Sequence, residues 1–147
     1  MFNYQFVKNN SRFLLFGFIL TFCSSFGQTF FIGIFNPYIR EDLSLSHSEF
    51  GLIYSLATLL SSFSLIWIGK KIDDFKIIYF AITACIFLAF SSFFLTLVTN
   101  IILLFFAIYF LRLSGQGLMT HTASTSMAKF FDLNRGKLLA FLGWGYP

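Results

Sequence analysis

Charge is the scarcest component of this 147-residue sequence, since only 11% of its residues are Asp, Glu, Lys or Arg. A soluble domain carries about 25% charged residues, so this chain lacks the side chains needed to cover a surface in water. Instead, 57% of its residues are hydrophobic and its mean hydropathy is +0.79. The composition excludes a soluble fold and predicts a surface that faces the lipid bilayer.

Cysteine is equally scarce, with Cys23 and Cys85 alone in the chain. Both lie in apolar runs without His or Cys at metal-ligand spacing, so we interpret them as small buried apolar side chains. The sequence also has no phosphate-binding loop and no pair of carboxylates in an apolar run. We therefore expect no catalytic residue, no metal site, no cofactor and no enzymatic activity.

The net charge of +4 does not indicate nucleic-acid binding, because the basic residues stand in short clusters beside apolar runs. In that position they set the orientation of a membrane protein. Lys8 and Arg12 before an apolar stretch are similar to a secretory signal, but the uncharged run over residues 13–39 is too long for one. We interpret that run as a retained first span and expect no nucleic-acid partner.

The uncharged runs predict membrane spans, because a crossing helix needs about 20 apolar residues. The long run after Lys76 is divided in two by a turn near Asn100, since the basic clusters at its two ends belong on one side of the membrane. The expected fold is an all-α integral membrane protein, a polytopic helical bundle. Its spans are expected near 13–36, 47–68, 77–98 and 101–128, with a fifth that starts near 138.

The orientation follows from the basic residues. With the N-terminus in the cytoplasm, Arg40 is the only basic loop residue outside. The cytoplasmic set comprises Lys8, Arg12, Lys70, Lys71, Lys76, Lys129, Arg135 and Lys137. The chain stops within the fifth span, so we expect 1–147 to be an incomplete N-terminal transmembrane domain of a longer protein in the cytoplasmic membrane.

The second span has a recognisable start. Ser46 and Glu49 are spaced as a capping box, and Leu45 with Phe50 fits a hydrophobic staple. His47 lies in this exposed helix start, where it needs no special role.

Arg112 is the most informative residue, because it falls inside an expected span. It lies roughly 16 Å from the outer end of that helix at about 1.5 Å per residue, close to the middle of the membrane. An arginine there costs at least about 2.5–3.5 kcal/mol on insertion scales, so it needs a partner or a wet cavity. Three partners stay open: a residue in the missing part of the chain, an anionic solute, or carbonyls and waters. The alternative is a structural tie between helices.

Two glutamines are expected near Arg112. Gln116 is one helical turn away on the same face, together with Gly115, Met119 and Ala123. Gln28 lies at a similar depth in the first span, on a polar stripe whose hydroxyls either bond back to their own helix or join helices. His121 falls on the opposite face, where we expect a hydrogen bond between helices. The stripe comprises Thr21, Ser24, Ser25 and Gln28.

Several segments resemble the major facilitator superfamily over essentially the whole chain. Residues 42–52 are similar to its outer loop and second-helix entry, and residues 69–76 to its Gly-x-x-x-Asp cytoplasmic loop. Residues 112–117 resemble the Arg-x-x-Gly-x-Gly pattern of its fourth helix, and residues 130–137 its loop into the fifth. Asp74 departs from the pattern, since the family has Arg or Lys there, and the later Gly-Arg-Arg is missing. The combination is similar to the monocarboxylate and oxalate/formate antiporter branch.

The resemblance implies a partial six-helix half of a secondary active transporter that moves a small organic solute, such as a carboxylate, by alternating access. It places Arg112, Gln116 and Gln28 in the substrate pathway, and Gly69 and Asp73 in a cytoplasmic gate loop. The implied partners are a small-molecule solute, with a coupling ion as a further candidate, the lipid bilayer and the missing C-terminal part of the chain. The alternative is a non-transporting polytopic sensor or assembly subunit.

The orientation predicts which loops an impermeant thiol reagent reaches in intact cells. Single cysteines introduced near Asp42 and Asn100, in a background without Cys23 and Cys85, are expected to react from outside. Cysteines near Lys71 and Asn134 are expected to react only after the membrane is permeabilised. Labelling near Lys71 from outside would reverse the topology.

Overall fold

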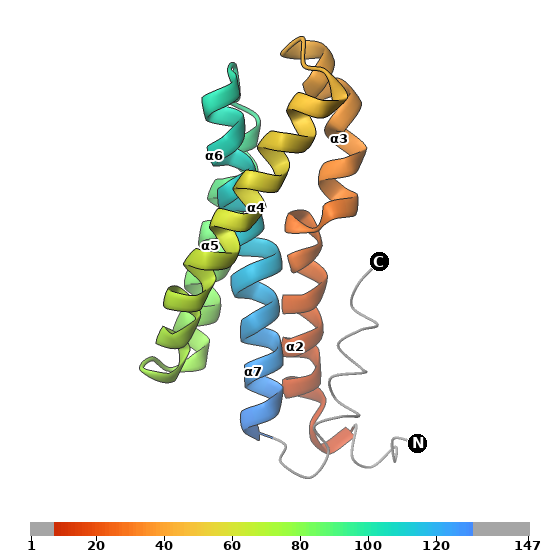
Figure 1. Cartoon of the computed structure of the whole chain (residues 1–147). Helices are drawn as coiled ribbons and strands as arrows, with labels where there is room; N and C mark the ends of the chain where they lie inside the picture. The colour runs from red at the N-terminus through yellow and green to blue at the C-terminus, as the bar shows by residue number, and fades with distance from the viewer. Residues whose placement is uncertain (1–7, 131–147) are drawn as a thin grey trace.

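The computed structural model describes residues 8–130, and all regular structure in that range is helical (Figure 1). Four helical stretches are long and apolar enough to cross a membrane, which confirms the predicted membrane bundle. Their bounds are Ser11–Asp42, His47–Asp73, Ile77–Leu95 and Ile101–Phe130. The expected fifth span near Leu138 lies outside the described residues.

The first span is not one uninterrupted helix. It consists of α2 (Ser11–Ser24), a 3₁₀ turn, η1 (Ser25–Gly27), and α3 (Thr29–Asp42). Gln28, between the last two, is extended, with φ −81° and ψ 158°. The sequence pattern predicts a single helix here, because one extended residue does not interrupt the uncharged run. The helix also continues to Asp42 rather than ending near residue 36, and Pro37 lies within it.

The second span is α4 (His47–Gly69), followed by the 3₁₀ turn η2 (Lys70–Asp73). Its start confirms the predicted capping box. Ser46 Oγ accepts the Glu49 amide at 3.2 Å, and the Glu49 carboxylate accepts the Ser46 amide at 2.8 Å. Leu45 and Phe50 on either side are buried.

The third span is α5 (Ile77–Leu95). The fourth consists of α6 (Ile101–Leu111), the π-helical segment η3 (Arg112–Met119) and α7 (Thr120–Phe130). The turn between them ends at Asn100, whose side chain caps α6 by accepting the Leu103 amide at 2.9 Å. The widened turns of η3 have no signature in the hydrophobic pattern, and such segments are frequent at functional sites.

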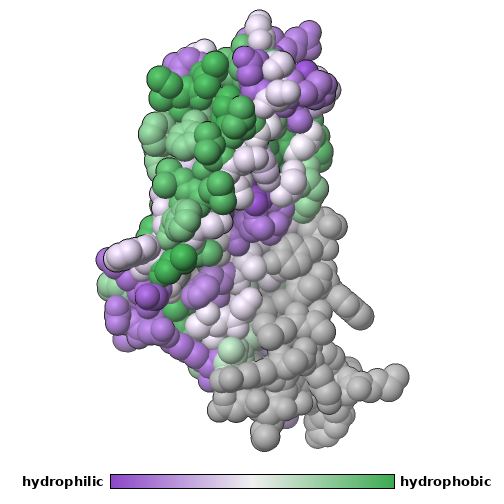
Figure 2. All heavy atoms as spheres, in the orientation of Figure 1, coloured by the Kyte–Doolittle hydropathy of each residue, from purple (hydrophilic) through white to green (hydrophobic). Residues whose placement is uncertain are grey.

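The fourth span is the centre of the described bundle. Helix α4 packs against α6 and η3, α2 packs against η3 and α7, and α5 packs against α6 and η3. Hydrophobic residues cover much of the face seen in Figure 2, between more hydrophilic ends. That distribution suits a protein whose outer surface meets lipid tails.

The first and fourth spans cross at Gly27 and Gly115, where their backbones touch. A Cβ added at Gly27 would lie 2.7 Å from the Gly115 Cα, and one added at Gly115 would lie 2.6 Å from the Gly27 Cα. A methyl group therefore fits at neither position unless the helices separate. Small residues at such crossings are the usual basis of helix association in membranes.

This crossing predicts that Gly115→Ala and Gly27→Ala each destabilise the folded protein. Overpacking of this kind costs about 1–3 kcal/mol, and we expect lower folded yield and a lower melting temperature in detergent. Gly33→Ala is the matched control, because nothing lies within 4 Å of a Cβ at that helical position. Equal stability of the Gly115→Ala and Gly33→Ala variants would contradict the prediction.

Candidate functional site

Arg112 begins η3 and points at the break in the first span. Its Nη1 donates to the Gly27 carbonyl oxygen at 3.3 Å and to Thr29 Oγ1 at 3.2 Å. Its guanidinium carbon also lies 5.3 Å from the centroid of the Tyr54 ring, within the range of a cation–π interaction. The side chain therefore links three of the four described spans.

The charge of Arg112 has no acidic partner among residues 8–130, where the one ion pair joins Lys129 and Asp73. Only 7% of the residue is exposed. Its Nε is buried and has no hydrogen-bond partner in that range. Carbonyl and hydroxyl oxygens thus satisfy the guanidinium in part, and the buried Nε–H is left without an acceptor there.

Arg112 and Gln116 line the same cavity, as their spacing predicts. The cavity has a volume of about 170 Å³ and lies between α4 and η3, with walls that also include Ser61, Ser62 and Gly117. A guanidinium, a primary amide and two hydroxyls are therefore available to a polar solute. Gly115 and Met119 do not line it: Gly115 packs on the first span, and Met119 is fully buried.

Gln28 does not reach that cavity. It is the half-buried residue before α3, one position after the carbonyl that accepts from Arg112. The hydroxyls of its polar stripe mostly bond back to their own helix, with Thr21 Oγ1 on the Gly17 carbonyl at 3.0 Å and Ser24 Oγ on the Thr21 carbonyl at 2.6 Å. Gln28 thus stands beside the Arg112 site, on the α3 side.

Two residues of the site were missed by reasoning from the sequence. Thr29 accepts from Arg112, and the Tyr54 hydroxyl donates to the same Thr29 oxygen at 2.8 Å. A polar Thr directly after Gln28 was a signal for the first. Tyr54 is one of six tyrosines and has no distinguishing pattern.

The two residues expected in the gate loop, Gly69 and Asp73, lie at the C-terminal end of α4 and in η2. Asp73 ends η2, and its carboxylate is 2.8 Å from Lys129 Nζ on α7. Gly69 is buried, and a Cβ there would lie 3.6 Å from His121 Nε2. The expected gate loop therefore contacts the end of the fourth span. This contact could not be predicted from the sequence, because Asp73 and Lys129 are far apart in the chain.

His121 differs from its expectation. Its Nδ1 is buried and has no hydrogen-bond partner among the described residues, so the predicted interhelical hydrogen bond is absent there. The ring instead packs beside Gly69.

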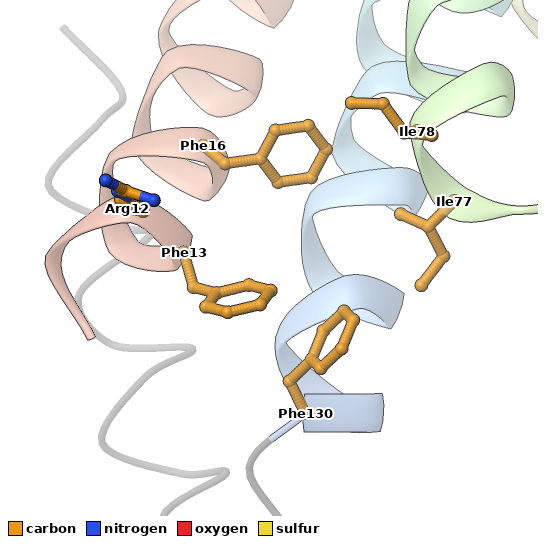
Figure 3. A pocket seen from close by; sticks show the side chains of 6 residues that line it. All are labelled: Arg12, Phe13, Phe16, Ile77, Ile78 and Phe130. Atoms are coloured by element: carbon orange, nitrogen blue, oxygen red, sulfur yellow. The ribbon is translucent and has the colours of Figure 1, made fainter. Parts of the chain in front are cut away.

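A different cavity, of about 380 Å³, lies between α2, α5 and α7 (Figure 3). Phe13, Phe16, Ile77, Ile78 and Phe130 form its walls, with Arg12 at one side. The ring centroids of Phe13 and Phe130 are 4.5 Å apart. Walls so apolar suit lipid or a packed helix better than a polar solute.

Comparisons with known proteins identify the family. The model of the Major Facilitator Superfamily matches residues 17–147, without indicating a branch. The searches of curated proteins and of solved structures found no match. The family consists of membrane transporters, which confirms the expectation that the chain is not an enzyme. Since the match covers most of the chain, this protein belongs to the Major Facilitator Superfamily.

Proposed function

We propose that this chain is part of a secondary active transporter that carries a small organic anion, such as a carboxylate, through a pathway lined by Arg112. The observation that carries the proposal is a buried guanidinium with an open donor and no acidic partner among residues 8–130. An uncompensated charge in a membrane span is costly. A carboxylate solute would compensate it.

The surroundings of Arg112 support a pathway rather than a simple tie between helices. Gln116 and the Ser61 and Ser62 hydroxyls share its cavity, and Gln28 stands at the break that Arg112 contacts. Interrupted helices near the middle of a span are a recurrent feature of transporter binding sites. The π-helical η3 and the broken first span meet at this point.

The same proposal includes the membrane, the orientation of the chain, the class of solute and a coupling ion. We place the protein in the cytoplasmic membrane with its N-terminus inside, on the distribution of basic residues. The similarity of residues 112–117 and 130–137, taken together, to the monocarboxylate and oxalate/formate antiporter branch favours a carboxylate. A coupling ion is a further expected partner. The competing function, a non-transporting sensor or assembly subunit, would use Arg112 to hold an acidic residue of a partner chain.

The Arg112 role predicts that Arg112→Gln in the full-length protein abolishes anion binding and leaves insertion and folding intact, because a neutral amide is cheaper in the membrane. Arg112→Lys should restore little, since an ammonium lacks the planar two-donor geometry that fits a carboxylate. Binding is measured on detergent-purified protein, with folded yield determined separately.

Arg12→Gln is the matched control, because that arginine is exposed at the start of α2. Normal anion affinity in well-folded Arg112→Gln would contradict the substrate role. If Arg112 instead neutralises an unseen acidic residue, Arg112→Gln should lower folded yield, because a buried carboxylate is then left unpaired. Arg112→Lys keeps the positive charge and should then lower the folded yield less.

The Asp73–Lys129 pair predicts a gating role for the cytoplasmic ends of α4 and α7. Asp73→Asn should slow transport in proteoliposomes severalfold and leave anion affinity largely unchanged, because a contact between helix ends acts on the conformational step. Lys129→Gln should have the same effect, and the exchange Asp73→Lys with Lys129→Asp should restore part of the rate.

The neighbouring carboxylate offers the control for that experiment. Asp74 is exposed and is not part of the ion pair, so Asp74→Asn should leave the rate unchanged. A large loss of affinity with normal turnover in Asp73→Asn would place Asp73 in the binding site instead.

A further inference from the structure

The break in the first span leaves the first turn of α3 without a cap. Helix α3 starts at Thr29, and no side chain caps it. The backbone amides of Thr29, Phe30 and Phe31 have no hydrogen-bond acceptor among the described residues. Such free N–H groups carry the positive end of the helix dipole and favour anions.

The carbonyl group that precedes the break, unlike these amides, has a hydrogen-bond partner. The Gly27 carbonyl accepts from Arg112 Nη1 at 3.3 Å, so the guanidinium offsets the partial negative charge there. The amide side has no comparable partner in residues 8–130. The break as a whole thus presents uncompensated positive potential next to α3.

Arg112 provides a second, independent indication of an anion. It is more than nine-tenths buried, its Nη1 lies 3.2 Å from the hydroxyl of the first α3 residue, and its Nε is without a partner in the described residues. The guanidinium of the fourth span therefore lies beside the row of backbone donors at the start of α3 in the first span. No carboxylate in that range occupies it.

We propose that the amides of the first α3 turn and the Arg112 side chain together form the carboxylate subsite of the transported solute. This proposal rests on the proposed function and adds to it the backbone ligands. Thr29 and Phe30 are exposed and Phe31 is half-buried, so the helix start is accessible. Binding by backbone amides would fix the anionic end of the solute beside Arg112.

Proline substitution can remove one of these amides selectively. Thr29 is the first helical residue, where proline is well tolerated, and Gln28 already has the extended conformation that a residue before proline requires. Thr29→Pro and Thr29→Ala both remove the hydroxyl that contacts Arg112, but only Thr29→Pro also removes the N–H. The difference between them isolates the backbone donor.

The experiment compares both variants in the full-length protein, with acetate as the probe and acetamide as its neutral isostere. We expect acetate to bind about tenfold more weakly to Thr29→Pro than to Thr29→Ala, as for a lost hydrogen bond to a charged group. Acetamide should bind to neither. Equal acetate affinity of the two folded variants would overturn the subsite.

An amide shift measurement on the unsubstituted backbone keeps the proposal testable if Thr29→Pro fails to fold. With ¹⁵N-phenylalanine labelling, and Phe30→Leu to assign the signal, acetate should shift the Phe30 amide resonance and acetamide should not. An unchanged Phe30 resonance at saturating acetate would overturn the subsite. The absence of acetate binding to the unsubstituted protein would do the same.

The two proposals fail in distinguishable ways. If Arg112→Gln keeps its acetate affinity, the proposed function is wrong and the subsite with it. If Arg112→Gln loses acetate binding while Thr29→Pro and Thr29→Ala bind equally, only the backbone part is wrong, and Arg112 holds the anion without α3.

Discussion

The contact between the backbones of Gly27 and Gly115 is the constraint on which the rest of the described structure depends. It brings an interruption of the first span against the widened π-helical segment of the fourth. Arg112, three residues before Gly115, can therefore reach the Gly27 carbonyl and the Thr29 hydroxyl. With a Cβ at either glycine the helices would separate, and Arg112 would lose the acceptors that make its burial tolerable.

Two opposite demands meet at this crossing. The hydrocarbon interior requires that backbone polar groups be bonded within the protein, whereas a transport pathway requires polar groups that a solute can use. The structure meets the first demand over most of each span with regular helix. At the crossing it leaves donors open: the Nε of Arg112 and the amides of the first α3 turn. Such local exceptions are where function is expected, because they are costly unless a ligand satisfies them.

The contact of Arg112 with Tyr54 and the ion pair of Lys129 with Asp73 join the same two spans. Arg112 and Lys129 both belong to the fourth span, and Tyr54 and Asp73 both belong to the second. Helix α4 packs directly on η3. A change in the hydrogen-bond partners of Arg112 can therefore move these helices and alter the Asp73–Lys129 contact. Under the proposed function, this arrangement would let solute binding at Arg112 act on the gate proposed at Asp73 and Lys129.

The membrane class, the number of described spans, the capping box at Ser46 and the position of Arg112 inside a span could all be predicted from the sequence, because they depend on local composition and short spacings. Gln116 was placed beside Arg112 for the same reason. The break at Gln28, the π-helical turn, the roles of Thr29 and Tyr54 and the Lys129 partner of Asp73 were decided by the tertiary structure. Each of these depends on contacts between spans distant in the chain, and a hydrophobic run gives no information about which face of one helix meets which face of another.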